Sequence, residues 1–390
     1  MIIGIVGAPN KGKSTFFSAA TMVDAQIADY PFTTIDPNKG TAYARSECPH
    51  VVLGLQKCDA RNSKCEHGAR LIPINVIDVA GLVPDAHLGK GMGFEFLGDL
   101  AQAQALIQVV DASARTDMWG RRVENADVCE EARMLRQEID FWIMAVLEKN
   151  WAKIKGRDIG QVGVALSGIN ASLAQCEAAA KQCGLQAAKI EWSEQQRLEF
   201  CRALGRMCKP IAIAANKCDM RGSMENVGKL KECCAGMLVV PTFAAGELAL
   251  RKAAAAGKIK YVPGDADFEE CAPMDQRQQD ALASIRKTMQ GNGGLGTGVQ
   301  RIVDAAVFGM LGLVDVYPVE DENRYCDGAG RVLPDALLMG KGSTVFDLAG
   351  KVHTDLQGRF VGAVDARSKR RVWKEAGLSK GDVIRIIAGR

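Results

Sequence analysis

The chain of 390 residues has no hydrophobic run long enough to cross a bilayer, and its charges nearly balance at a formal +3. A membrane-spanning helix needs about 20 consecutive apolar residues, so the sequence predicts no membrane partner. No leader segment separates Met1 from the first apolar strand-like run. We therefore expect a cytoplasmic globular protein of two or three domains, with 47% hydrophobic and 24% charged residues.

Regular disulfide spacing is also missing, although the chain has 13 cysteines. An odd number without a repeated pattern favours reduced thiols over a disulfide framework. One group stands apart, because a single polar stretch contains Cys48, His50, Cys58, Cys65 and His67. Cysteine and histidine are zinc ligands, but the Cys-x-His spacing differs from the usual Cys-x-x-Cys pairs. An ordinary surface loop without a metal is the favoured interpretation, and zinc binding is the alternative.

A glycine-rich loop near the N-terminus lies between the apolar run 2–6 and a helix-compatible stretch at 14–22. Its residues, all predicted to bind nucleotide, are Gly7, Ala8, Pro9, Asn10, Lys11, Gly12, Lys13, Ser14 and Thr15. Where a strand ends in such a turn and a helix begins, several backbone N–H groups and the positive helix end point at one spot. Lys13 adds a charge at the β- and γ-phosphates, and Ser14 offers a hydroxyl to Mg²⁺. The chain is therefore predicted to bind a nucleoside triphosphate.

Further apolar segments read as buried parallel strands that end in polar residues. The strands at 71–79, 105–110, 211–215 and 238–240 lead to Asp78, Asp111, Asn216 and Pro241, respectively. Helical stretches separate most of them, which predicts an α/β fold with the doubly wound sheet of P-loop NTPases. In such sheets the ligand binds beyond the carboxyl ends of the strands, where these polar residues fall.

Two motifs indicate a guanine-nucleotide switch. In Asp78-Val-Ala-Gly81, the aspartate would hold Mg²⁺ through water and the Gly81 amide would sense the γ-phosphate. In Asn216-Lys217-Cys218-Asp219, one carboxylate can accept from both N1–H and the 2-amino group of guanine. Adenine would leave Asp219 unpaired, so the motif predicts GTP rather than ATP. Lys217 would lie along the base, and Asn216 would tie the base to the phosphate loop.

Two weaker motifs complete the predicted site. Tyr30-Pro-Phe-Thr-Thr offers a hydroxyl that can reach Mg²⁺ and close over the γ-phosphate; either Thr33 or Thr34 would serve, and Thr34 is preferred. Backbone amides near Ala244 would contact guanine O6. The predicted metal ligands are Ser14, Thr34 and Asp78, and the predicted catalytic groups are Lys13, Thr34 and Gly81.

The chain order predicts three parts. A one-sided apolar stripe at 131–151 and a capping pair, Ser193 with Gln196, indicate helices between the strands that end at Asp111 and Asn216. We therefore expect a nucleotide domain at 1–117 and 208–312 with a helical insertion at 118–207. After a helix at 299–311 the sequence becomes rich in turns and its apolar segments become short. This change predicts a small α+β domain at 313–390. A helix there would be capped by Ser343 or Thr344.

Positive charge is concentrated near the C-terminus. From Lys341 onward there are 11 Lys and Arg against 5 Asp and Glu, a net +6, and four of these cations fall within 367–371. A solvated face and a surface for RNA phosphates fit this charge equally well.

Together these motifs resemble the Obg superfamily of translation-factor-class GTPases, and more narrowly the archaeal-type branch of the YchF (Obg-like ATPase) family. The resemblance rests on GAPNKGKST, ADYPFTTIDPNKG, DVAGLV with the following GKGMGFEFL, and NKCD. YPVEDEN, LMGKGSTVFDLAGKVHTDL and ARSKRRV resemble a TGS domain, which is ubiquitin-like. The resemblance implies a Mg²⁺-dependent switch that hydrolyses GTP to GDP and phosphate, with the ribosome or RNA as partner.

Individual residues bear on which nucleotide is used, how fast it is hydrolysed and whether a second cation takes part. Relatives whose base motif ends in Glu use ATP, whereas this chain keeps Asp219, so an ATPase is the alternative to a GTPase. Leu82 stands where Ras-like proteins place a water-orienting Gln, which predicts slow unaided hydrolysis and leaves open an adaptor with negligible turnover. Asn10 matches the asparagine of potassium-activated relatives, so K⁺ is a candidate second cofactor. His87 is a further candidate for contacting the catalytic water.

Overall fold

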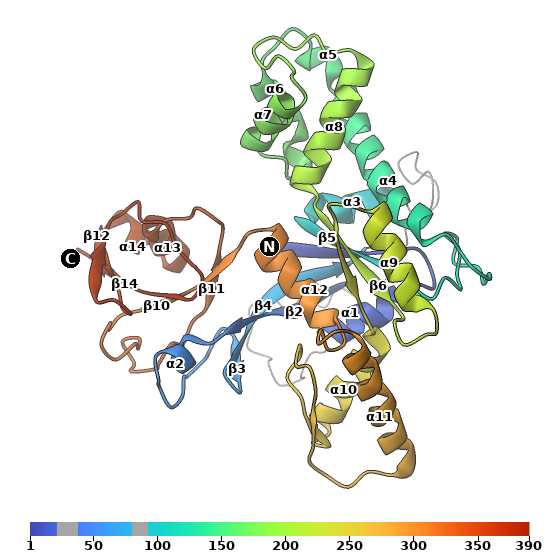
Figure 1. Cartoon of the computed structure of the whole chain (residues 1–390). Coiled ribbons are helices and arrows are strands. Elements are labelled where there is room, and N and C mark those ends of the chain that lie inside the picture. Colours follow the sequence, from blue (N-terminus) through green and yellow to red (C-terminus); the bar gives the residue numbers. More distant parts are fainter. Residues whose placement is uncertain (22–37, 80–92, 390) are drawn as a thin grey trace. The chain divides into compact units, whose positions relative to one another are not determined.

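The computed structural model describes residues 1–21, 38–79 and 93–389 (Figure 1). Two compact units are formed by the chain, and each is built from segments that are not contiguous in sequence. The first unit contains Met1–Ala42 and Asn75–Ile302, and the second contains Tyr43–Ile74 and Val303–Arg390.

The largest sheet has the strand order β2-β4-β1-β5-β6-β7, with β3 paired on β4. Its strands are β1 (Ile2–Val6), β2 (Lys39–Glu47), β3 (Lys64–Glu66), β4 (Ala69–Asp78), β5 (Ala105–Asp111), β6 (Ile211–Asn216) and β7 (Leu238–Pro241). The neighbours from β4 through β7 all pair in parallel. Every residue of β5 and β6 is buried, and strands covered on both faces read as continuous apolar runs. The predicted α/β sheet is confirmed.

Four described helices of the first unit follow strands of this sheet along the chain. They are α1 (Lys13–Thr21), α3 (Gly93–Gln102), α9 (Ser223–Cys233) and α10 (Ala244–Ala255). After α10 come β8 (Ile259–Lys260), β9 (Glu269–Glu270), α11 (Gln276–Gly291) and α12 (Val299–Asp304). The second unit resumes at Val303 within α12, and a π-helical turn (Ala305–Met310) follows in it. Leu250, Phe268 and Leu282 share a small core that holds α10 and α11 together.

The long connection between β5 and β6 is largely helical. Its helices are α4 (Val128–Lys149), α5 (Trp151–Ile154), α6 (Ile159–Leu166), a 3₁₀ turn (Ser167–Ile169), α7 (Leu173–Gln182) and α8 (Glu194–Cys208). The helix predicted from the apolar stripe is confirmed as α4, and Ser193 and Gln196 form the predicted capping box on α8. Ile139 of α4 and Phe200 of α8 belong to one core with α6 and α7. Figure 1 shows α5, α6 and α7 gathered at one end of α4 and α8.

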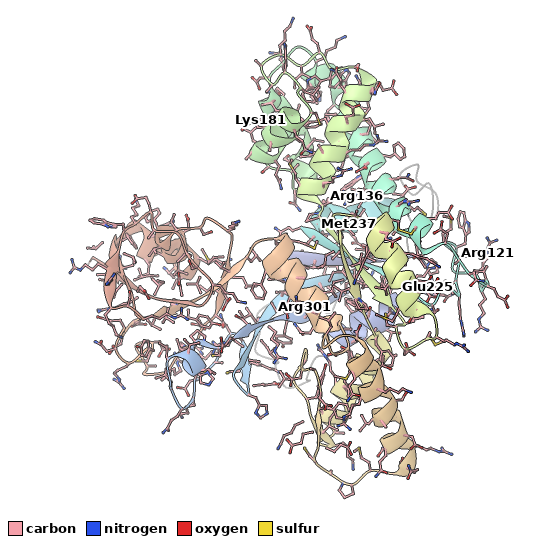
Figure 2. All side chains as sticks on the ribbon, viewed as in Figure 1. Arg121, Arg136, Lys181, Glu225, Met237 and Arg301 are labelled. Carbon is pink, nitrogen blue, oxygen red and sulfur yellow. A yellow bond between two sulfur atoms is a disulfide. The ribbon has the colours of Figure 1, made fainter. Side chains whose placement is uncertain are left out.

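One disulfide links two helices of the first unit. Cys129 near the start of α4 is bonded to Cys233 at the end of α9, 104 residues away. Arg136 and Glu225 mark these two packed helices in Figure 2. The expectation of reduced thiols is therefore wrong for this pair, because the helix packing that joins them leaves no spacing signal in the sequence. The other eleven cysteines are free.

The second unit is built on a five-stranded sheet of order β11-β10-β14-β12-β13. Its elements are β10 (Val314–Val319), β11 (Leu337–Met339), α13 (Val345–Val352), α14 (Thr354–Gly358), β12 (Phe360–Asp365), β13 (Arg370–Val372) and β14 (Asp382–Ala388). Thr344 caps α13, and Asp347 completes the capping box, which confirms the predicted helix start. Residues 43–74 add α2 (Pro49–Val52) and the β3–β4 hairpin, and Ile72 shares a core with Tyr317 and Leu333.

A membrane-spanning helix was not expected, and none of the helices in the described ranges is long and apolar enough to be one.

Candidate nucleotide-binding site

The phosphate loop joins β1 to α1 and lies against the ends of neighbouring strands. Gly12 has a φ of +86°, and a Cβ on it would lie 2.5 Å from Asn216 Nδ2. A Cβ on Gly7 would lie 2.7 Å from the carbonyl oxygen of Val109. Side chains at either position would push the loop away from the sheet. Close packing therefore requires glycine at both positions, and at Gly12 the left-handed backbone conformation requires it as well.

Lys13 and Asp78 meet at the carboxyl end of the sheet. The parallel register places Ile5 of β1 opposite Asp78 of β4, so the loop after β1 begins beside this carboxylate. Lys13 Nζ lies 2.5 Å from Asp78 Oδ1 and donates to the Val79 carbonyl at 2.6 Å. The two side chains are 15% and 19% exposed, so the pair remains open to solvent on one side. An ammonium and a carboxylate are thus adjacent at this end of the sheet.

The oxygen donors near this pair fit a magnesium ion. Ser14 is exposed at the start of α1, and its hydroxyl has no hydrogen-bond partner among the described residues. Mg²⁺ prefers oxygen ligands, and in nucleotide sites it takes one or two protein ligands together with phosphate oxygens and water. Ser14 and Asp78 supply that kind of set. The third predicted ligand, Thr34, lies outside the described residues, as do Thr33, Gly81, Leu82 and His87.

Asn216 connects the base motif to the phosphate loop. Its Nδ2 donates to the Lys11 carbonyl at 3.1 Å, and its Oδ1 accepts from the Ala244 N–H at 3.1 Å. The side chain is buried at the end of β6. Three segments more than 25 residues apart are therefore fixed by one amide. The Ala244 N–H is engaged within the protein, so it is not the free donor for guanine that the sequence suggested.

Lys217 is held in place by a carboxylate that the sequence analysis gave no role. Its Nζ donates to the Asn10 carbonyl at 2.9 Å and lies 2.8 Å from Asp111 Oδ2. Burial would raise the pKa of Asp111, but hydrogen bonds from Lys217, Ser113 and Thr116 together hold it below its usual range. Asp111 therefore stays ionised and positions Lys217. The only sequence signal was a carboxylate at the end of an apolar strand.

Lys11 differs from Lys13 although both belong to the loop. Its ammonium is buried, lies 2.7 Å from Glu131 Oε2 and donates to the Thr116 carbonyl at 2.8 Å. Burial raises the pKa of Glu131 to about 7 against the opposing charge of Lys11. The Lys11 side chain thus anchors the loop to α4, and only its backbone remains for a phosphate.

Two other predicted residues keep polar groups open. Asp219 is exposed, and its carboxylate has no hydrogen-bond or ion-pair partner in the part of the chain that the structure describes. Asn10 has a φ of +63°, and its Nδ2 donates to the Gly120 carbonyl at 2.8 Å. That bond fixes the Asn10 amide group and leaves its Oδ1 as an oxygen ligand. Ala8 and Pro9 lie in the loop and Thr15 lies in the first turn of α1, all without side-chain hydrogen bonds to described residues.

A basic edge of the second unit carries an exposed aromatic side chain. Val372 of β13 packs against the core, so Arg371 and Trp373 on either side of it point away from that core. Trp373 is 85% exposed. Arg370 and Arg371 are exposed and form no ion pair with a described residue, whereas the Lys369 ammonium lies 4.4 Å from the Tyr325 ring centroid. Flat aromatic faces beside unpaired cations are features of single-stranded RNA sites.

Comparisons with known families agree with this geometry. Residues 2–147 match the family described as 50S ribosome-binding GTPase. Residues 214–321 match the Obg-like GTPase YGR210-like, G4 motif-containing domain, and residues 329–388 match the TGS domain.

Individual relatives extend over the whole chain. A GTP-binding protein of Methanocaldococcus jannaschii is 44% identical, with 99% of each chain covered. One of Schizosaccharomyces pombe is 31% identical over 88% of each chain. The crystal structure of a GTP-binding protein from Pyrococcus horikoshii covers 100% of both chains at 37% identity, with a TM-score of 0.81. The chain therefore belongs to the Obg-like, YchF-related family of GTP-binding proteins, with a YGR210-like G4 domain and a C-terminal TGS domain.

Proposed function

We propose that this protein is a Mg²⁺-dependent GTPase that hydrolyses GTP to GDP and phosphate. The observation that supports this most is the Asn216 side chain, which bonds to the phosphate loop and to the start of α10 at once. Three residues further on, the Asp219 carboxylate is open to solvent. A phosphate cradle is thereby joined to a carboxylate that can accept both donors of guanine.

The catalytic roles follow from charge and position. Lys13 would stabilise negative charge on the transferring phosphoryl group, and Ser14, Asp78 and Thr34 would organise Mg²⁺. When nucleotide and metal bind, Lys13 would move its hydrogen bond from Asp78 to a phosphate oxygen, which frees the carboxylate for the metal's water. No covalent intermediate is required, because phosphoryl transfer in this class depends on positioning and electrostatics. The Gly81 amide would couple the γ-phosphate to the following segment.

Hydrolysis by the isolated protein is expected to be slow. Leucine at position 82 cannot orient water, so an additional cation or a partner must supply the missing stabilisation. The side-chain Oδ1 of Asn10, fixed by the bond from Nδ2 to the Gly120 carbonyl, would help to hold K⁺ against the phosphates. Single-turnover hydrolysis should therefore be faster in KCl than in NaCl at equal ionic strength, and equal rates would remove K⁺ from the mechanism.

The base preference is the sharpest test of the proposal. A fluorescent guanine nucleotide bound in the presence of Mg²⁺ would be displaced by unlabelled GTP or ATP. Because an adenine leaves the Asp219 carboxylate desolvated and unpaired, GTP should compete at concentrations at least about 100-fold lower. Tighter competition by ATP would replace the GTPase with an ATPase of the Obg-like family.

We also propose that the TGS domain engages ribosomal or other single-stranded RNA through the edge at Arg370, Arg371 and Trp373. The support is the pairing of unneutralised guanidinium groups with an indole that is almost fully exposed. Bases stack on aromatic faces while cations neutralise phosphates, so the same short segment offers both interactions.

A further inference from the structure

Four metal-ligand side chains converge in the second unit. The ligand atoms of Cys48, His50, Cys58 and Cys65 all lie within 4.8 Å of one another. No other group of this kind is found in the ranges 1–21, 38–79 and 93–389. The four residues come from the turn after β2, from α2, from the following loop and from β3. The nucleotide site uses none of them.

The distances within the group match those around a tetrahedral zinc ion. Cys48 Sγ lies 3.7 Å from Cys58 Sγ, and Cys65 Sγ lies 3.6 Å from His50 Nδ1. With Zn–S near 2.3 Å and Zn–N near 2.05 Å, tetrahedral geometry separates two sulfurs by about 3.8 Å and a sulfur from a nitrogen by about 3.6 Å. Both observed contacts have these lengths although neither pair is covalently bonded.

Backbone structure, rather than the side chains alone, produces this convergence. The Cys48 amide donates to the Gly68 carbonyl at 2.8 Å, which holds the start of α2 against the β3–β4 turn. Cys65 lies directly opposite Arg70 in that hairpin. His67 occupies the turn with a φ of +48° and is exposed, so it is not one of the ligands. The five-residue group suggested by the sequence thus becomes a group of four.

The loop that carries Cys58 is fixed by the C-terminal part of the chain. The Asp59 N–H donates to the Val332 carbonyl at 2.7 Å, and the Val332 N–H donates to Asp59 Oδ2 at 2.9 Å. The Arg61 N–H donates to the Pro334 carbonyl at 2.8 Å. Cys58 is therefore held in place by a ladder of bonds to residues about 270 positions away.

A buried cation beside the sulfurs lacks a carboxylate partner. Arg70 is fully buried, and its Nη1 lies 3.5 Å from Cys58 Sγ and 3.9 Å from Cys48 Sγ. Its other donors bond to Ser63 and to the carbonyls of Leu333 and Pro334. Among the described residues no Asp or Glu pairs with it. The Arg70 guanidinium also lies 5.4 Å from the Tyr317 ring centroid. Because a buried cation without a carboxylate partner is costly, this environment favours a negative group beside the sulfurs.

We propose that Cys48, His50, Cys58 and Cys65 bind one structural zinc ion. Three thiolates and a neutral imidazole around Zn²⁺ carry a net charge of −1, which the Arg70 guanidinium neutralises while donating to the sulfurs. Four protein ligands fill the coordination sphere, so the ion has no open position for catalysis. Its role is to fix residues 48–65 relative to one another, and hydrogen bonds from Asp59, Arg61 and Arg70 connect this stretch to the C-terminal segment at 332–334. The site does not depend on the proposed GTPase activity.

The first measurement uses the full-length chain without a histidine tag, purified under reducing conditions and dialysed. Elemental analysis should find about one zinc per chain, because a closed four-ligand site retains its metal. Replacement with Co²⁺ should give strong visible d–d bands together with sulfur-to-cobalt charge-transfer absorption. Zinc far below stoichiometry together with a Co²⁺ spectrum lacking thiolate bands would overturn the proposal, and so would bound iron in place of zinc.

Matched variants then assign the ligands. Cys58→Ser and Cys65→Ser should each lose most of the zinc on dialysis against a weak chelator. Cys271→Ser, which alters an exposed free thiol in the first unit, and His67→Ala should retain it. Undiminished zinc in both ligand variants would refute the assignment. Since the wild-type metal content and cobalt spectrum require no variant, misfolding of a ligand variant cannot hide the answer.

Discussion

The nucleotide site and the basic edge of the TGS domain contain similar numbers of cations, but these cations differ in whether they pair with carboxylates. In the first, Lys11, Lys13 and Lys217 each pair with a carboxylate of a distant segment. In the second, Arg370 and Arg371 pair with no described carboxylate. The contrast indicates that the nucleotide site is preorganised before its ligand arrives, whereas the charges of Arg370 and Arg371 remain open to solvent.

Preorganisation also explains why Lys11 and Lys13, which are close in sequence, have different structural roles. Lys11 is buried against Glu131 and fixes the loop, while Lys13 lies on an open pair with Asp78 and can exchange partners. A ligand with three clustered phosphates gains from fixed geometry because little ordering remains to be done on binding. A single-stranded nucleic acid, whose backbone adapts, gains mainly from charge and stacking.

The largest effect should come from removing the mobile charge at the phosphates. Lys13→Ala is expected to lower single-turnover GTP hydrolysis by about 100- to 1000-fold, because a preorganised electrostatic contact to the transition state is lost. Quench-flow with radiolabelled GTP measures this. The control is Lys258→Ala, which alters a lysine after α10, distant in sequence from the phosphate loop. Unchanged hydrolysis in Lys13→Ala would show that the preorganised site is not where GTP reacts.

Substitution of Asp219 should change the base preference almost as strongly as loss of Lys13 changes hydrolysis. In Asp219→Asn the carboxamide can donate to the 2-carbonyl of xanthine but cannot accept both guanine donors. We expect GTP affinity to fall about 100-fold and xanthosine triphosphate to become the preferred ligand. Isothermal titration with both nucleotides tests the exchange. Equal loss for both would mean that Asp219 supports the fold and does not read the base.

The TGS edge should respond in two separable ways. Trp373→Ala should weaken binding to single-stranded RNA about 30-fold without altering its salt dependence, since stacking worth about 2 kcal/mol is lost. Arg370→Ala with Arg371→Ala should instead reduce the slope of log affinity against log salt by about 1.5. Fluorescence anisotropy over a salt series distinguishes the two.

Trp119→Ala is the matched control, since this exposed tryptophan belongs to the first unit. Sedimentation with ribosomes in the GTP-analogue and GDP states extends the test to the natural target. Absence of both RNA and ribosome binding in every state would end the translation proposal.

The smallest effect is expected at the residue that positions Lys217. Asp111→Asn keeps the shape but removes the charge, and should weaken GDP binding about 10-fold by loosening Lys217 along the base. Because the pKa of Asp111 is held low, the wild-type carboxylate stays ionised at neutral pH, so this loss should not vary across the neutral range. Asp280→Asn, at an exposed position of α11, is the control. A loss that disappears as the pH falls through the neutral range would contradict the assigned charge state.

Much of this molecule could be predicted from local sequence. The parallel strands were recognisable because buried strands are continuous apolar runs, and α4, α8 and α13 because stripes and capping pairs act over a few residues. The phosphate loop and the base motif were likewise short and contiguous. These signals are local, so no three-dimensional information was needed to find them.

Other features depend on segments that only folding brings together. The Lys11–Glu131 pair, the Lys217–Asp111 pair and the Cys129–Cys233 disulfide each span at least 100 residues, and no spacing rule connects their members. The same holds for Arg70 beside the four ligand side chains, which the β3–β4 register and the bonds to 332–336 decide. Sequence determined which chemistry the chain carries, because residue type and short-range order suffice for that. The tertiary structure decided which groups meet, because contact between distant segments exists only after the sheets are assembled.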